Sequence, residues 1–364
     1  MVIRCSKGAV SNIPKSWKAL QLKNFVNLTA GGKLDLTKSN YVDEGIPAFS
    51  ASGQDGFVNV VEHSGTGVVL SAIGARCGKA FYAEGQWSLM ANTYMLQANP
   101  EVMSDRYLWE LVNDEQYWYR SGTAQPFIKP RDMEEAWVPV PPLKEQRLIL
   151  SALDKIAVQK QRKADQLLFI QQLYRGFLQR LKAGGFFSNA SKLPIRDVCS
   201  VGMGETLIAE HMTGSGIPVF SAGTQPKPWA WTSNNKKRYE RGTVIVSARG
   251  TIGAPRLPDY DQYTSTQTTL YVKPKELDPL FLWGWLKTLD FRPISSTQAI
   301  PMLTVSSMGG VRIPIPSVAE QEWVAKQIQM FENLKKNIQK QMDLCDVLKT
   351  GMKSQLLYGI KRMA

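Results

Sequence analysis

The sequence predicts an α+β protein with an internal duplication: two strand-rich domains in tandem, each followed by one long helix. Two observations predict this arrangement. Short phrases recur along the chain at a near-constant offset, and each repeat ends in a long stretch with the apolar periodicity of a helix. We expect the two helices to pair as an antiparallel coiled coil that spaces the domains about a pseudo-two-fold axis.

The duplication is visible in four pairs of motifs that keep their order. The phrases "IPAFSASG" and "IPVFSAG" begin at Ile46 and Ile217, and "VPVPPLKEQ" and "IPIPSVAEQ" end at Gln146 and Gln321. Between them, "LSAIG" is matched by "VSARG", and "YLWELV" by "FLWGWL". The last pair lies 175 residues apart (321 − 146), and the drift along the chain is only a few residues. The motifs divide the chain into domain 1 (residues 1–142), helix 1 (143–185), domain 2 (186–317) and helix 2 (318–364).

Each domain is expected to be rich in strands. β-branched runs such as "GVVLSAI" and "GTVIVSA" stop at glycine-containing turns, as half-buried strands do. The phrases "DRYLWELVN" and "PLFLWGWLK" predict one short helix in each domain. Phe49 and Phe220, in the first repeated phrase, are expected to be buried anchors, and the Ser-Ala-Gly run after each is expected to form a loop.

The two long segments contain no proline, and their apolar residues recur at spacings of three and four. A helix of about 38 residues is roughly 57 Å long and cannot bury such a stripe alone, so the other copy is the simplest partner. A second interpretation is a pair of core helices within a bundle. The residues that we expect to pair the helices and to meet partner subunits are Leu153, Ile156, Leu167, Leu173, Ile328, Phe331, Met342 and Leu348.

The charge of the chain favours a polyanionic partner. The net charge is +13 and the pI is near 9.5, which is typical of nucleic-acid-binding proteins, although solubility alone also explains a basic surface. Seven basic residues and one acidic residue lie between Lys227 and Arg256, whereas acidic residues outnumber basic ones between Tyr41 and Met90. We therefore expect a nucleic-acid footprint that is uneven between the two domains.

The sequence lacks the residues that several kinds of catalytic or metal site require. The two histidines, His63 and His211, are isolated, so no repeated metal or nucleophile–base site is expected. The phrase "GARCGKA" has the wrong glycine spacing for a phosphate loop. Four cysteines lie far apart, which argues against a zinc site or a disulfide framework and suits a reducing cytoplasm. No apolar run is long enough to span a membrane, and the N-terminus does not read as a secretory signal. We expect no catalytic residue, no metal and no cofactor.

Taken together, the repeated phrases resemble the specificity subunit of type I restriction–modification systems. The resemblance is carried by "IPKSWKALQLKNF", "FSASG" with "FSAG", "LSAIG" with "VSARG", and "VPVPPLKEQ" with "IPIPSVAEQ", and it covers essentially the whole chain. It implies two target-recognition domains, each of which reads one half of a split sequence in double-stranded DNA. It also implies helices that dock DNA methyltransferase subunits (two of them), a restriction and translocase subunit that joins the complex, and a non-catalytic chain that works on DNA in the cytoplasm.

Base edges are read by short polar side chains and by Arg or Lys on loops at strand ends. In domain 1 the candidates are Ser50, Ser52, Gln54, Arg76, Lys79, Thr123, Gln125, Lys129 and Arg131. In domain 2 they are Ser221, Thr224, Gln225, Trp229, Trp231, Lys236, Lys237, Arg238, Arg249, Arg256, Thr297 and Gln298. A second interpretation places the two tryptophans in the packed core.

Two other functions stay open at this point. One is a coiled-coil adaptor whose end domains bind proteins, and DNA binding that weakens steeply with salt would count against it. The other is a self-contained DNA methyltransferase or nuclease, against which the missing motifs argue.

Overall fold

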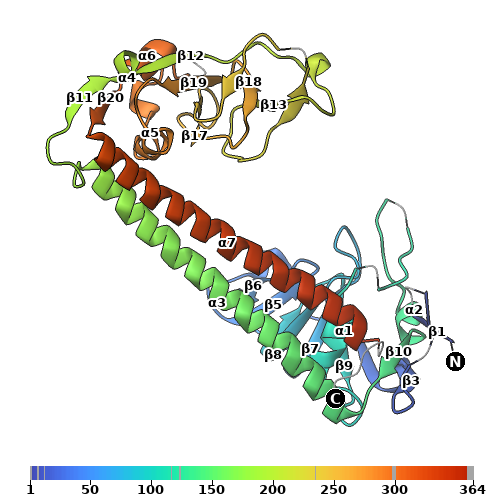
Figure 1. The fold of residues 1–364 in the computed structure, drawn as a ribbon. Helices are drawn as coiled ribbons and strands as arrows, with labels where there is room; N and C mark the ends of the chain where they lie inside the picture. The colour runs from blue at the N-terminus through green and yellow to red at the C-terminus, as the bar shows by residue number, and fades with distance from the viewer. Residues whose placement is uncertain are drawn as a thin grey trace. The chain divides into compact units, whose positions relative to one another are not determined.

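The computed structural model describes residues 2–5, 8–11, 13–115, 117–122, 124–233, 235–296 and 301–358. The chain divides into two compact units, of which unit 1 is Met1–Arg162 with Gln341–Ala364 and unit 2 is Lys163–Lys340 (Figure 1). Both boundaries fall inside long helices, α3 (Leu143–Lys182) and α7 (Val318–Leu356). Each unit therefore holds one strand-rich domain and part of each long helix.

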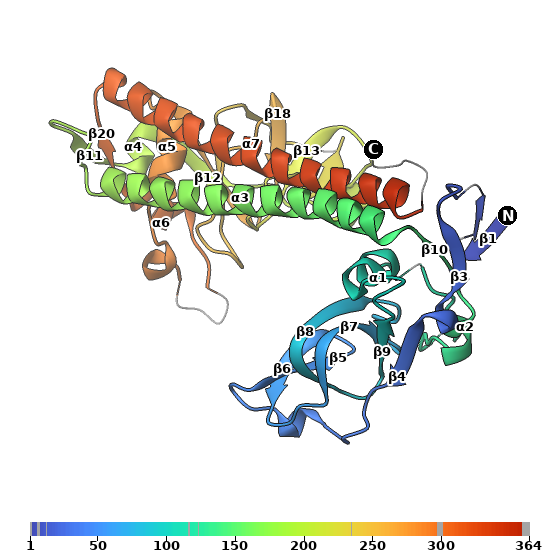
Figure 2. The same cartoon turned by 90° about the horizontal axis from the view of Figure 1, so that it is seen from below.

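Domain 1 is built on a six-stranded sheet with α1 (Asp105–Val112) packed against it (Figure 2). The strand order is β4 (Val26–Ala30), β9 (Thr93–Ala98), β7 (His63–Ser71), β8 (Ala80–Leu89), β5 (Ile46–Ser50) and β6 (Gly53–Val58). Smaller elements are the hairpin of β1 (Val2–Cys5) and β2 (Gly8–Ser11), the pair of β3 (Lys18–Gln21) and β10 (Trp137–Val140), and α2 (Pro130–Glu134).

Domain 2 repeats this order with its sheet divided into two. One sheet orders β12 (Cys199–Met203), β19 (Thr269–Pro274), β16 (Val244–Ser247) and β17 (Pro255–Arg256). The other orders β14 (Ala230–Thr232), β13 (Ile217–Phe220), β18 (Gln262–Ser265) and β15 (Tyr239–Glu240). Around them lie β11 (Ser191–Pro194) paired with β20 (Arg312–Ile315), and the helices α4 (Ile195–Val198), α5 (Pro279–Leu286) and α6 (Val305–Gly310).

The first repeated phrase occupies the same place in both domains. It forms β5 and β13, which pair in parallel with β8 and β18 respectively. Phe49 is 8% exposed and Phe220 is 0% exposed, so the prediction that both are buried anchors is confirmed. The duplication predicted from the sequence is therefore a duplication of fold.

The repeated Glu-Gln motif joins each domain to its own helix. The Gln146 side chain donates to the Pro141 carbonyl (3.0 Å) and accepts from the Ser104 amide (3.1 Å) at the start of α1. Gln321 likewise donates to Pro316 (3.0 Å) and accepts from the Asp278 amide (2.9 Å) at the start of α5. Both glutamines are buried. Because a buried amide needs partners for both its donor and its acceptor, the motif fixes where each long helix leaves its domain.

The long helices are antiparallel within each unit. In unit 2 the ring of Tyr174 lies 5.2 Å from that of Phe331, and the ring of Phe177, one turn further along α3, lies 6.3 Å from that of Trp323, earlier in α7. In unit 1 the Lys160 ammonium donates to the Asp346 carboxylate at 2.6 Å. Together with the two strand-rich domains, this arrangement confirms the predicted fold class.

The predicted helical stripe is only partly buried. Leu153 and Ile328 are buried in the cores of their units, and four predicted positions are half-buried, namely Ile156, Leu167, Phe331 and Met342. Leu173 and Leu348, which are equivalent positions of the repeat, are instead 47% and 49% exposed. In α3 the buried position is Tyr174, one residue later, whose ring packs against Phe331 of α7.

Domain 1 holds α7 through a buried charge. Glu110 of α1 is 1% exposed and forms ion pairs with Lys353 at 2.9 Å, Lys349 at 3.6 Å and Arg106 at 3.0 Å. Burial by itself raises the pKa of Glu110, but these three cations outweigh it and lower the pKa below its usual value. The equivalent helix of domain 2 ends beside Lys287, which pairs with Glu332 of α7 at 3.2 Å.

None of the helices in the described part of the chain has the length and apolar character of a membrane span.

Candidate nucleic-acid interface

Three loops meet at the strand ends of domain 1. They are Ser50–Gly53, Ala72–Lys79 and the segment before α2 that ends at Lys129. The Arg76 guanidinium donates to the Ser52 carbonyl at 3.0 Å, which joins the first loop to the second. The Gly74 amide donates to the Pro126 carbonyl at 2.9 Å, which joins the second loop to the third.

The same three loops meet in domain 2. They are 221–229, 248–254 and the segment before α6, of which residues 297–300 lie outside the described part. The Gly223 amide donates to the Ser247 hydroxyl at 3.0 Å, and the Leu303 amide donates to the Ala248 carbonyl at 2.9 Å. The loops that carry the predicted reading residues are therefore brought together twice, once in each domain.

In domain 1, most of the predicted reading residues are accessible at these loops. The exposed ones are Ser52, Gln54, Arg76, Gln125, Lys129 and Arg131. Lys79 is half-buried, and Arg131 is paired with Glu135 at 3.0 Å. Ser50 is also half-buried and donates its hydroxyl to Asp55 at 2.8 Å. Thr123 lies outside the described residues.

Asp55 and Tyr41 form a charged feature of domain 1 that sequence reasoning missed. The Tyr41 hydroxyl donates to Asp55 at 2.6 Å, and the Lys38 ammonium lies 3.6 Å from the same carboxylate. Burial works to raise the pKa of Asp55, but hydrogen bonds from Tyr41 and Ser50 and the charge of Lys38 lower it. Burial also raises the pKa of Tyr41 to about 12. A fixed carboxylate on β6 therefore lies beside the first loop of domain 1.

In domain 2, the predicted residues are also largely accessible. The exposed ones are Thr224, Gln225, Trp229, Trp231, Lys236, Lys237, Arg238 and Arg249. Trp229 is 55% exposed and Trp231 is 36% exposed, so the interpretation of these tryptophans as packed core is wrong. Thr297 and Gln298 lie outside the described residues.

Arg256 is the exception among the predicted residues of domain 2. It is only 9% exposed, and its guanidinium donates to the carbonyls of Ser221 and Gln225 while lying over the Phe220 ring, 5.5 Å from its centroid. Burial lowers its pKa. The structure therefore corrects the expectation that this side chain is presented to DNA, because the side chain is buried and its two terminal nitrogens, Nη1 and Nη2, donate to carbonyls of loop 221–229.

A hydroxyl cluster beneath loop 221–229 was also missed. The Thr268 hydroxyl accepts from the Ala222 amide at 3.1 Å and lies 2.7 Å from the Thr266 hydroxyl and 3.2 Å from that of Ser221. The only signal in the sequence is the run "TSTQTT", which reads equally well as an exposed strand. A groove of about 890 Å³ lies beside these loops and is lined by Thr224, residues 250–255 and Arg292, among others.

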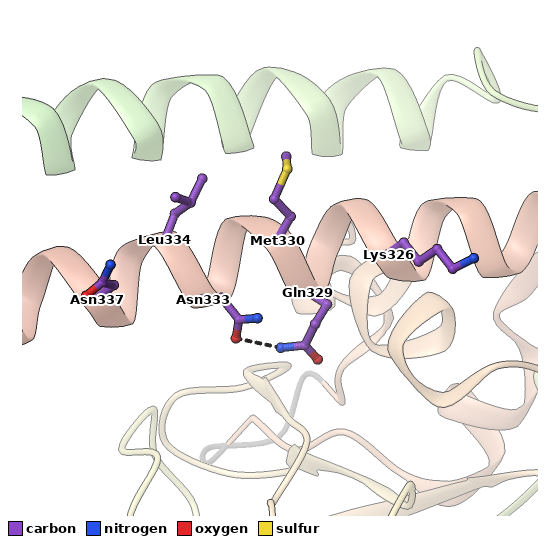
Figure 3. A pocket seen from close by; sticks show the side chains of 6 residues that line it. All are labelled: Lys326, Gln329, Met330, Asn333, Leu334 and Asn337. Carbon is purple, nitrogen blue, oxygen red and sulfur yellow. Dashed lines mark hydrogen bonds between the residues drawn. The ribbon is translucent and has the colours of Figure 1, made fainter.

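The long helices carry equivalent surfaces in the two units. A shallow groove on α3 is lined by Arg147, Leu150, Ser151, Asp154, Lys155, Val158, Gln159 and Arg162. A groove on α7 is lined by Lys326, Gln329, Met330, Asn333, Leu334 and Asn337, and every one of these positions matches a lining position of α3 at an offset of 175 (326 − 151). Figure 3 shows Met330 and Leu334 pointing toward the neighbouring helix, and Gln329 hydrogen-bonded to Asn333 at 2.9 Å.

Exposed apolar side chains also recur at equivalent positions of the two helices. Phe169 and Leu173 of α3 are 59% and 47% exposed, and their counterparts in α7, Leu344 and Leu348, are 55% and 49% exposed. Isolated exposed apolar residues are common on protein surfaces. Exposure of the same two positions in both repeats is a more specific observation than a single exposed residue.

A model of the type I restriction modification DNA specificity domain matches residues 14–166 and again residues 188–343. The chain belongs to this family. A Methanocaldococcus jannaschii type I restriction enzyme specificity subunit is 20% identical over 404 residues, covering 95% of this chain and 93% of that protein. A Haemophilus influenzae protein named as a type I restriction enzyme specificity subunit is 23% identical over 349 residues, covering 88% of this chain and 89% of that protein.

Solved specificity subunits share the fold of this one. The S subunit of a type I system from Mycoplasma genitalium aligns with a TM-score of 0.63 at 16% identity, over 97% of this chain and 98% of that chain. A chain from a structural study of complex assembly in a type I restriction–modification system aligns with a TM-score of 0.65, over 95% and 99%. The role of this specificity subunit is therefore DNA sequence specificity within a type I restriction–modification system.

Proposed function

We propose that this specificity subunit reads a bipartite target in double-stranded DNA, with domain 1 reading one half and domain 2 the other, and directs partner enzymes to it. The observation that carries the proposal is the three-loop cluster that occurs once in each domain. A duplicated domain presents two similar surfaces to one duplex, as a symmetric dimer does, and half-sites read from one DNA face lie about one helical turn, roughly 10 base pairs, or a multiple of it apart.

We expect the two loop clusters to read different half-sites, because they carry different side chains on the same backbone arrangement. In domain 1 the first loop is a tight turn between β5 and β6, beside the Asp55 carboxylate. In domain 2 the corresponding loop runs from Ser221 to Trp229 and is followed by the basic segment Lys236–Arg238. We therefore propose that domain 2 makes more of the phosphate contacts, which position the protein on DNA, and that short polar side chains in both domains read bases.

The long helices are proposed to dock two copies of a methyltransferase subunit. The support is the pair of repeat-equivalent exposed surfaces, Phe169 with Leu173 and Leu344 with Leu348. A partner that binds one of these surfaces would find apolar side chains at the equivalent helix positions in the other unit. A restriction and translocase subunit would then join this assembly.

We assign no catalytic residue to the chain, so methyl transfer and DNA cleavage are proposed to reside in its partners. Purified methyltransferase subunits are expected to methylate duplex DNA only when this chain is added, and the chain alone is expected to transfer no methyl group and to cut no DNA. Methylation by the chain alone would contradict the proposal. Assembly with the partner without any DNA binding would favour a protein-binding adaptor instead.

A further inference from the structure

A turn in domain 2 holds a carboxylate with its backbone amides. The Lys236 amide lies 2.8 and 2.9 Å from the two carboxylate oxygens of Glu205, and the Lys237 amide lies 2.8 Å from the second of them. Consecutive backbone N–H groups that converge on one point form a concave anion site, and phosphate groups bind in such sites. In this protein the anion in the site is its own side chain.

The turn lies inside the most basic segment of the chain. The side chains of Lys236, Lys237 and Arg238 are exposed, and the Lys237 ammonium also donates to the Met203 carbonyl at 2.9 Å. The Asn235 amide group donates to the Lys237 carbonyl at 2.9 Å and so closes the turn. Two backbone amides thus hold the Glu205 carboxylate, and the three exposed basic side chains belong to the same short segment.

The Glu205 backbone is held in place by the end of β12. A Cβ atom on Gly204 would lie 2.1 Å from the Thr266 carbonyl oxygen, so only glycine fits there. The Glu205 amide donates to the Ser265 carbonyl at 2.7 Å. The Glu205 side chain therefore extends from a fixed backbone and is the movable part of the contact.

The fold itself does not require this carboxylate. In domain 1, Gly31 occupies the place of Gly204: its amide donates to Thr93 at 2.9 Å, just as the Gly204 amide donates to Thr269 at 2.9 Å. The next residue in domain 1 is Gly32, which has no side chain to place in a turn. Glu205 is therefore a feature of domain 2 alone, and domain 2 is also where the basic turn lies.

The site adjoins the reading loop of domain 2. Glu205 bonds to Ser265, and the next residue, Thr266, donates its amide to the Phe220 carbonyl at 2.9 Å, at the point where loop 221–229 begins. The Thr266 hydroxyl also donates to the Ser221 hydroxyl at 3.1 Å. When the bases of a duplex contact loop 221–229, the phosphate backbone of that duplex is expected to lie near the Lys236–Lys237 turn.

We propose that the Lys236–Lys237 turn is a DNA phosphate site, that Glu205 fills it in the free protein, and that a backbone phosphate displaces the Glu205 carboxylate on binding. The inference rests on the proposed function of domain 2. It adds that the Glu205 carboxylate competes with DNA phosphates for the turn. This competition lowers the affinity of domain 2 for DNA of any sequence.

The test compares Glu205→Gln with Glu240→Gln in the full-length chain. Glu240 is exposed, lies two residues after Arg238 and pairs with Lys273, so its variant gains the same charge without altering the turn. We expect Glu205→Gln to bind duplexes with and without the target sequence about three- to ten-fold more tightly, with unchanged sequence preference, and Glu240→Gln to change affinity less than about two-fold. Equal effects of the two variants, or weaker binding by Glu205→Gln, would overturn the inference.

Hydrogen exchange gives a second readout that does not depend on affinity. In Glu205→Ala, the Lys236 and Lys237 amides are expected to exchange rapidly in the free chain and to become protected when duplex DNA is added. In the unaltered chain both amides are expected to be protected with or without DNA. Amides of Glu205→Ala that stay unprotected in the DNA complex would overturn the inference. Failure of the unaltered chain to bind DNA at all would instead overturn the proposed function.

Discussion

The loops that we propose to read DNA are held by hydrogen bonds from within their own domains. In domain 2 the clearest example is Arg256, whose guanidinium bonds to the carbonyls of Ser221 and Gln225 beneath the loop. Arg249, seven residues earlier in the chain, is exposed. Two arginines of one segment, both predicted to contact DNA, are thus placed in different environments: one supports the loop and the other is available at its surface.

Arg256→Met is expected to lower the free energy of unfolding by about 2–3 kcal/mol, because it leaves two loop carbonyls without their donor. It should also reduce discrimination at the half-site read by domain 2, since loop 221–229 loses its support. Denaturant unfolding and competition between duplexes would measure the two effects. The matched control is Arg249→Met, for which we expect unchanged stability and weaker DNA binding. Equal stability of the two variants would show that Arg256 does not hold the loop.

At the scale of elements, each short helix of a domain is tied to the long helices. Gln146 and Gln321 fix the start of each long helix against its own domain. Glu110 of α1 binds Lys349 and Lys353 near the end of α7, so domain 1 also holds the helix that belongs to the other repeat. The contacts within unit 1 therefore link the beginning of the chain to its last helix.

The Glu110 contact predicts a pH dependence of stability. Because the folded-state pKa of this carboxylate is lowered, its contribution is present above its unfolded pKa of about 4.3 and is lost as pH falls through the folded value. Glu110→Gln should therefore lower the melting temperature at pH 7, and the difference from the unaltered chain should shrink below about pH 4. Glu134→Gln, at an exposed position, should follow the unaltered chain at every pH. A gap for Glu110→Gln that stays constant with pH would contradict this account.

At the scale of the whole molecule, the duplication gives the chain two loop clusters, which we propose to bind DNA, and two helix surfaces, which we propose to bind partner subunits. The side chains of the two loop clusters differ, which supports the proposal that the two halves of the DNA target differ in sequence. The helix surfaces share exposed apolar positions, which supports the proposal that two copies of one partner dock there.

Leu173→Glu and Leu348→Glu are each expected to remove one of the two methyltransferase subunits from the complex, and the double variant to remove both. Stability should change little, because both side chains are about half exposed. Native mass spectrometry of the mixed subunits would count the copies. Gln171→Glu and Thr350→Glu add the same charge at exposed positions two residues away and should leave both copies bound. Full assembly by the double variant would show that the partner docks elsewhere.

Much of this organisation was predictable from the sequence because it rests on patterns that recur. The repeated phrases predicted the duplication of fold, and burial of Phe49 and Phe220 was expected because phenylalanine is usually buried. Tertiary contacts decided the rest. Tyr174 displaces Leu173 from the buried stripe, and Arg256 turns inward to carbonyls that a linear sequence does not place beside it. The Glu205 contact joins segments 31 residues apart, for which neither segment alone gives a signal.

The central claim is that each domain reads its own half of one DNA target. Sequencing methylated positions in a host that carries this chain and its methyltransferase tests it most directly. The unaltered chain should give one motif with two defined halves around a nonspecific spacer of fixed length. Thr224→Ala combined with Gln225→Ala should relax one half and leave the other half and the spacer unchanged. Relaxation of both halves, or an unchanged motif, would contradict the claim.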